Sequence, residues 1–155
     1  MANQIPVLSL EHMEDLMPLI REILNSGKSV RILPRGISML PMLRQEIDSV
    51  VLSPLPETLQ KYDLPLYQRD DGKYILHRIV AVGETCTCIG DNQFVPEPGV
   101  RRDQMIALVT GFYRGEKFNS VTEPGYRFYC RFWHFSRPVR HFIRRGIGWL
   151  RRKFR

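Results

Sequence analysis

The sequence predicts a mainly β protein: an antiparallel, partly closed β fold with one helix before it and a basic amphipathic helix after it. Short apolar segments separated by turn residues fill the middle of the 155-residue chain, and this pattern is typical of antiparallel β structure. Helical spacing of apolar residues appears near the N-terminus and again near the C-terminus. The chain is also long enough for one domain with a hydrophobic core of its own.

The first helix is expected over residues 10–26. Its apolar residues fall at helical spacing: Met13, Leu16, Met17, Ile20, Ile23 and Leu24. Ser9 is a candidate N-cap and Gly27 stands where a C-cap is expected. Pro18 is expected to kink or restart the helix. We therefore interpret residues 1–27 as an N-terminal helix packed on the body.

The β domain is expected over residues 28–118. Five segments have strand patterns, at 29–33, 49–52, 74–82, 85–89 and 105–113. The turn sequences PRG, SPLP, DDGK, GDN and EPG separate them.

The tail, residues 119–155, has a different composition. From Tyr126 onward it holds ten Lys and Arg residues and no acid, whereas residues 1–125 hold 13 basic and 16 acidic residues. After Pro138 the apolar residues return at helical spacing, with arginines between them, and an aromatic segment, YRFYCRFWHF, comes before. The tail therefore predicts a basic amphipathic helix with an aromatic lead-in.

Three roles fit such a tail. It can lie in a membrane interface, pack its apolar face on the body, or bind nucleic acid, for which the short acidic N-terminal segment offers no helix-turn-helix domain. Of these we favour the membrane interface. Its expected membrane-binding residues are Trp133, Arg140, Phe142, Arg144, Arg145, Trp149, Arg151 and Arg152.

Cysteine usage and hydropathy indicate a cytoplasmic protein. Cys86, Cys88 and Cys130 are odd in number and lack C-x-x-C spacing, which argues against a disulfide framework and a zinc site. We expect reduced, mostly buried thiols, and no metal or other cofactor. The N-terminus lacks the basic start of a secretory signal, and no apolar run approaches the length of a membrane span.

Ser38 is a candidate nucleophile, because it stands between a glycine that frees the backbone and a proline that fixes it, in RGISMLP. A serine needs a base to accept its proton. His12 falls in the predicted first helix, and His134 and His141 fall in the tail. His77, in YILHRIV, is flanked by strand residues, where a sheet can hold its ring. The alternative is a structural histidine on a half-buried strand.

Three motifs in order, GISMLP at 36–41, LHRIV at 76–80 and GDN at 90–92, resemble the signal peptidase I superfamily of serine peptidases, which includes LexA-type self-cleaving repressors. The resemblance covers residues 28–115. The chain is similar to the histidine-type branch, found in archaea and the endoplasmic reticulum, since His77 stands where other members have lysine. The resemblance implies the signal-peptidase/LexA-like fold.

The resemblance also implies the site residues. Ser38 is then the nucleophile, His77 the general base, and Asp91 the acid that supports the histidine, with Asp103 as the second candidate. Gly36, Ile37, Met39 and Pro41 form the turn and the substrate cleft. As an alternative, Asp91 beside Gly90 fits a β-turn aspartate.

The sequence thus predicts a serine endopeptidase that cleaves a precursor or leader peptide at the membrane surface. Relatives commonly carry a transmembrane anchor, which the basic tail would replace here. A non-catalytic peptide- or membrane-binding module on the same fold is the alternative. A repressor that cleaves only itself is disfavoured, because the base lysine and a DNA-binding domain are missing.

Overall fold

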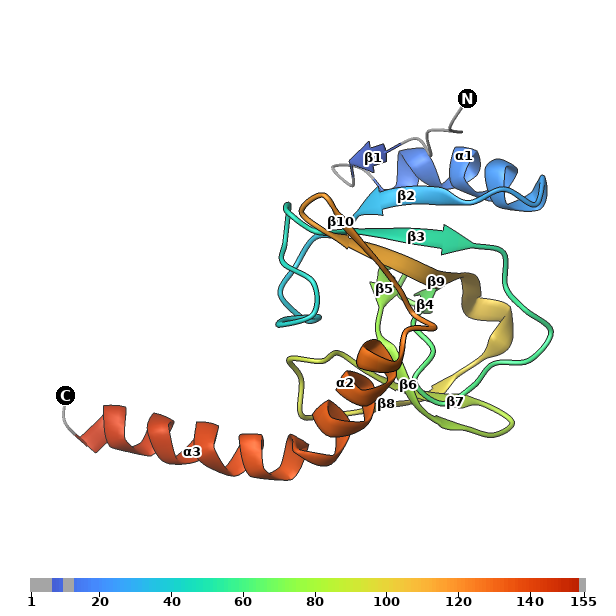
Figure 1. The fold of residues 1–155 in the computed structure, drawn as a ribbon. Helices are drawn as coiled ribbons and strands as arrows, with labels where there is room; N and C mark the ends of the chain where they lie inside the picture. The colour runs from blue at the N-terminus through green and yellow to red at the C-terminus, as the bar shows by residue number, and fades with distance from the viewer. Residues whose placement is uncertain (1–6, 10–12, 154–155) are drawn as a thin grey trace.

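The computed structural model describes the backbone of residues 7–9 and 13–153 and the side chains of residues 13–149 (Figure 1). A curled sheet forms the upper part of the molecule in Figure 1, with helix α1 above it and a smaller sheet below. Helices α2 and α3 follow at the lower side, and α3 extends away from the body. The prediction of a mainly β chain with an N-terminal helix and a C-terminal helix is confirmed.

Within the described residues, the larger sheet has seven strands, and β9 (Met105–Arg114) is its centre. Strand β9 pairs with β3 along one edge and with β4 and β10 along the other, always antiparallel. Register shifts in the β3–β9 and β4–β9 pairs mark β-bulges, which bend a sheet and so contribute to its curl. The order is β1 (Val7–Ser9), β2 (Val30–Leu33), β3 (Ser49–Ser53), β9, β4 (Pro65–Gln68) and β5 (Tyr74–Leu76), with β10 (Lys117–Ser120) beside β9. The β1–β2 pair is parallel.

The smaller sheet contains β6 (Arg78–Val82), β7 (Cys86–Ile89) and β8 (Glu97–Val100), all antiparallel. The prediction of one strand over 74–82 is wrong, because the chain changes sheet at His77. Strand β5 pairs with β4 in the larger sheet, whereas β6 pairs with β7 in the smaller one. A single residue, His77, therefore joins the two sheets.

Helix α1 (Met13–Asn25) packs on the larger sheet through Met17, Ile20 and Leu24. The helix runs through Pro18, and Gly27 ends it with φ +77° and an N–H bonded to the Leu24 carbonyl at 2.9 Å, so the predicted C-cap is confirmed. Ser9, the expected N-cap, lies in β1 instead. Residues 10–12 of the predicted helix, with His12, lie outside the described residues.

Two helices follow the sheets, α2 (Pro124–Phe135) and α3 (Arg137–Lys153). The prediction of a helix after Pro138 is confirmed, and the aromatic lead-in also proves helical, as α2. Tyr126, Tyr129 and Cys130 attach α2 to the body. Among the described residues, no helix has the length and apolar character needed to cross a membrane.

Candidate active site

The Ser38 loop joins β2 to β3 and is held by the GDN turn. The Asn92 N–H donates to the Ser38 carbonyl at 2.8 Å, and the Asn92 amide donates to the Ile37 carbonyl at 3.1 Å. Gly90 allows this approach, because a Cβ there would lie 2.6 Å from the Ser38 carbonyl oxygen. Two of the three motifs thus form one structural unit around the serine.

Gly36 bends this loop with φ +91°, a conformation that favours glycine. Its N–H donates to the side-chain oxygen of Gln45 at 3.0 Å. The backbone N–H of Ser38 makes no hydrogen bond among the described residues.

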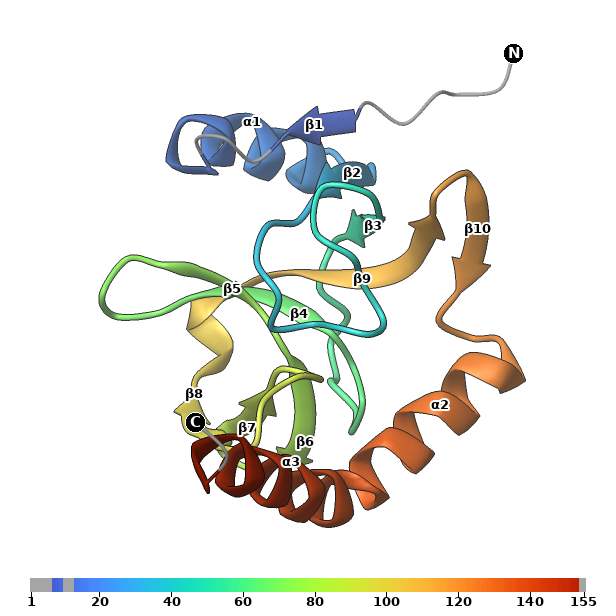
Figure 2. The ribbon, with the colours of Figure 1, turned by 90° about the vertical axis from the view of Figure 1, so that its left-hand side faces the viewer.

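His77 faces the same pocket as Ser38. The pocket has a volume of about 110 Å³, and the loop that carries Ser38 lies in front of the sheet in Figure 2. Its lining comes from the loop and from β5: Pro34, Arg35, Gly36, Ser38, Met39, Leu43, Arg44, Gln45, Tyr74, Ile75, Leu76 and His77. Ser38 and His77, which both belong to the described residues, form no hydrogen bond with one another. The two residues therefore share a pocket and are not in hydrogen-bond contact.

The His77 side chain is buried, with 3% exposed surface. Burial and the nearby Arg69 guanidinium lower the pKa of His77 to about 4, against the opposing effect of Glu97 and Asp91. The imidazole is therefore neutral at pH 7 and has a lone pair to accept a proton.

Asp91 lies at 0% exposure in a buried ion pair with Arg78, the residue after His77. Arg78 donates to both carboxylate oxygens, at 2.8 and 2.7 Å, and Tyr129 donates to one of them at 2.9 Å. The Trp133 indole N–H donates to the Asp91 carbonyl at 2.7 Å. Asp91 thus ties β6 to α2, and it makes no hydrogen bond with His77 among the described residues.

Asp103 lies on a short 3-10 helix, Arg102–Gln104, with 74% of its side chain exposed. Its carboxylate pairs with Arg101 at 3.1 Å. It is not among the residues that line the Ser38–His77 pocket. The structure therefore keeps Asp103 outside the group formed by Ser38 and His77.

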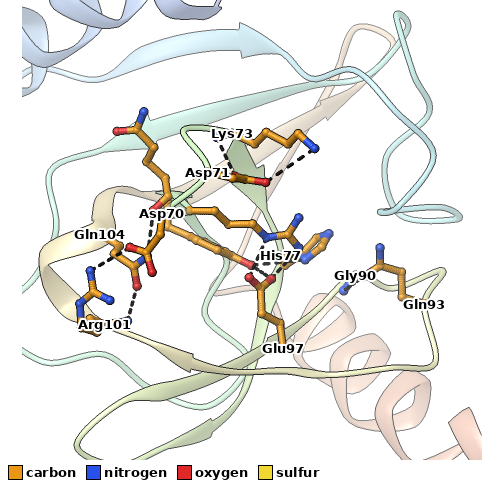
Figure 3. Close-up of polar contacts among 12 residues, drawn as sticks. Asp70, Asp71, Lys73, His77, Gly90, Gln93, Glu97, Arg101 and Gln104 are labelled. Carbon is orange, nitrogen blue, oxygen red and sulfur yellow. Dashed lines mark hydrogen bonds and ion pairs between the residues drawn. The ribbon is translucent and has the colours of Figure 1, made fainter.

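Three residues beside His77 were not singled out by the sequence: Tyr67, Arg69 and Glu97. The Tyr67 hydroxyl oxygen lies 3.4 Å from His77 Nδ1 and donates to Glu97 Oε2 at 2.6 Å. Arg69 binds both Glu97 oxygens at 2.7 Å. Figure 3 shows Glu97 reaching toward His77 from the smaller sheet. No local motif marks this cluster, since its members come from β4, the following turn and β8.

The predicted cleft residues have different positions. Gly36 and Met39 line the pocket, and Met39 is also part of the main core. Ile37 is 60% exposed. Pro41 lies in a second hollow of about 370 Å³, between the serine loop and α3, together with Leu40, Asn92, Phe94, Trp133, Arg140 and Arg144.

The predicted membrane-binding residues have different surroundings. Trp133 and Arg140 face the body, with the Arg140 guanidinium 3.7 Å from the Trp133 ring centre, and Arg144 lies near the Phe94 ring. Phe142, Arg144, Arg145 and Trp149 are exposed, and the last three line a hollow together with Phe94. Arg151 and Arg152 belong to the last turn of α3, and their side chains lie outside the described residues.

Comparison of the chain with protein-family models, with curated proteins and with solved structures gives no match. In the described residues, no group of three or more His, Cys, Asp or Glu side chains is arranged to hold a metal ion. The chemical case for a function therefore depends on the Ser38–His77 pocket itself.

Proposed function

We propose that this protein is a serine endopeptidase of the signal-peptidase-like superfamily, with the corresponding signal-peptidase/LexA-like fold. One observation carries the proposal: Ser38 and a neutral, buried His77, far apart in the sequence, line one pocket. A serine and a neutral imidazole at a common pocket are the two groups that acyl transfer requires. The substrate class is a precursor or leader peptide.

In the proposed reaction, Ser38 Oγ attacks the scissile carbonyl carbon and its proton passes to His77. The carbonyl electron pair moves to oxygen, where the free Ser38 N–H is a suitable donor to the oxyanion. Collapse of this intermediate breaks the C–N bond, and His77 returns the proton to the leaving amine. Water then attacks the acyl ester, gives a proton to His77, and releases the acid as Ser38 recovers its proton. Because catalytic contacts often tighten when substrate binds, we expect the Ser38–His77 contact to close in the complex.

Strand β5 provides a place for an extended substrate. It is the last strand in the order of the larger sheet, and Tyr74, Ile75 and Leu76 line the pocket. A peptide that adds to such an edge gains backbone hydrogen bonds and passes its carbonyls along the pocket. We expect the scissile bond to lie between β5 and the Ser38 loop.

A peptide-library digestion read by mass spectrometry tests the proposal. Wild-type protein is expected to cut a defined subset of peptides, and Ser38→Ala and His77→Ala are each expected to abolish the cuts. Ser120→Ala and His141→Gln are matched controls that lie outside the pocket lining and should cut as wild type does. Absence of cleavage by wild type, or cleavage retained in Ser38→Ala, would overturn the assignment and favour the non-catalytic module.

The tail supports the second part of the proposal, peripheral binding to an anionic membrane. Helix α2 attaches to the body by Tyr126, Tyr129 and Cys130, so its opposite face, with Phe128, Phe132 and Phe135, points outward and is exposed. Packing of the tail's apolar face on the body is thus not what the structure has for these residues.

Helix α3 also has exposed apolar side chains. Arg140 and Arg144 lie on the side of Phe94 and Trp133 on the body. Val139, Phe142, Ile143 and Ile147 are all exposed. A helix that combines exposed apolar side chains with many arginines fits the interface of an anionic lipid surface. Each arginine near such a surface contributes about 1 kcal/mol.

Co-sedimentation with vesicles tests this part. We expect binding to vesicles that contain phosphatidylserine, weaker binding to phosphatidylcholine vesicles, and at least about tenfold weaker binding for Phe132→Ser/Phe142→Ser, since each ring buries substantial apolar area. Leu19→Ser, an exposed apolar residue on α1, is the matched control and should bind normally. Absence of binding, or a dimer or a DNA complex that the double variant abolishes instead, would overturn the membrane assignment.

A further inference from the structure

The cluster beside His77 is built from three polar side chains with definite hydrogen-bond directions. Arg69 donates to both oxygens of Glu97 at 2.7 Å, and the Tyr67 hydroxyl donates to one of them at 2.6 Å. These hydrogen bonds, with that of Arg69 the largest effect, hold the pKa of Glu97 below its usual range. Glu97 is therefore an ionised carboxylate, which can only accept hydrogen bonds.

The ionised Glu97 fixes the direction of the next contact. Tyr67 has one hydroxyl proton, and it uses this proton in the hydrogen bond to Glu97. The phenol oxygen therefore has only lone pairs left for His77. Burial, together with the adjacent carboxylate, raises the pKa of Tyr67, which keeps the phenol protonated. At 3.4 Å from that oxygen, His77 Nδ1 is in place to donate, and donation requires its proton.

From this geometry we propose that Tyr67 and Glu97 are positioning residues that hold His77 as its Nδ1-protonated tautomer. Nε2 is then the nitrogen with the free lone pair, and it is the atom that accepts the Ser38 proton. The Tyr67–Glu97 pair thus takes the place of the single aspartate in a Ser–His–Asp arrangement. The catalytic consequence depends on the proposed peptidase function, whereas the tautomer does not.

The cluster also differs electrostatically from a direct His–Asp contact. The charge of Glu97 is offset by the bidentate Arg69, and a neutral phenol separates the carboxylate from the imidazole. The charged groups that act on His77 are Arg69, Glu97 and Asp91, and Asp91 is itself paired with Arg78. The net negative charge near His77 is therefore small and stabilises the imidazolium only weakly. We expect the His77 imidazole to remain neutral well below pH 6.

Nitrogen-15 NMR of the imidazole tests the assignment without any substrate. In wild type, Nδ1 is expected to show the shift of a protonated nitrogen and Nε2 that of an unprotonated one. Tyr67→Phe removes the acceptor and should give a mixture of tautomers. In Glu97→Gln the neutral amide is a weaker hydrogen-bond acceptor than the carboxylate. Tyr67 can then donate to His77 Nδ1, and the Nε2-protonated form should increase. Tyr113→Phe, on β9, is the matched control and should leave the tautomer unchanged.

Kinetics on any cleaved peptide give a second readout. Tyr67→Phe is expected to lower kcat by about 10- to 100-fold with little change in KM, because Tyr67 is not among the residues that line the pocket. An Nε2-protonated His77 in wild type, or a tautomer unchanged in both variants, would overturn the inference. If the tautomers are as expected but neither wild type nor any variant cleaves a peptide, the inference about His77 is retained and the proposed function is overturned.

Discussion

Replacement of Asp91 by alanine is expected to lower the free energy of unfolding by about 3–5 kcal/mol, because it leaves a buried guanidinium without its counter-charge. The side chains of Asp91 and Arg78 are 0% and 2% exposed, and two hydrogen bonds join them. Asp103→Ala is the matched control. Its side chain is 74% exposed and pairs with a partner that is 48% exposed, so its loss should cost less than about 1 kcal/mol.

Urea denaturation followed by circular dichroism measures both changes under the same conditions. The double variant Arg78→Met/Asp91→Ala should lose less stability than the sum of Asp91→Ala and Arg78→Met, because no unpaired charge remains. Similar losses for Asp91→Ala and Asp103→Ala would refute the reasoning. So would an additive double variant, since it would mean that the two side chains do not interact.

Three further changes test other parts of the structure. The pKa of His77 is about 4 in the folded chain against 6.5 ordinarily, so the unfolded chain binds the proton more tightly. The free energy of unfolding of wild type should therefore fall by about 2 kcal/mol from this group between pH 7 and pH 5. Urea titrations at both pH values should show a smaller fall for His77→Gln. Gly90→Ala puts a Cβ 2.6 Å from the Ser38 carbonyl oxygen and should cost about 1–3 kcal/mol by urea denaturation, whereas Gly146→Ala, with no atom within 4 Å of the added Cβ, should not destabilise; equal effects would contradict this. Burial raises the pKa of the Cys88 thiol to about 12 and also raises those of Cys86 and Cys130, so a thiol-reactive dye at pH 8 should modify the three thiols quickly only after unfolding; rapid reaction of the folded protein would show that they are accessible.

Elements with regular apolar spacing could be predicted from the sequence. Helix α1 and strands β2, β3, β7 and β9 fall where the pattern indicates. Strands β4 and β8 were missed because they are short and contain Pro65 and Pro98, which are rare within strands. Helix α2 was missed because aromatic residues occur on both its inner and outer faces, which hides the helical period.

The site was predictable where one short segment carries the signal. Ser38 and His77 stand in such segments, and the structure places both at one pocket. Asp91 follows from the sequence only as an acid near the site, because its partner, Arg78, is known only once the two sheets are assembled. Tyr67 and Glu97 could not be found, since their contact depends on β4 and β8 meeting across the two sheets. The prediction of one strand over 74–82 failed because nothing in its apolar pattern marks the change of sheet at His77.

Formation of a covalent adduct on Ser38 tests the central claim most directly. Protein is incubated with a small fluorophosphonate, digested, and analysed by mass spectrometry to locate the modified residue. We predict one adduct, on Ser38, formed at a rate that His77→Ala lowers by at least about a hundredfold. No adduct on Ser38, or an adduct formed equally fast without His77, would contradict a serine nucleophile activated by this histidine.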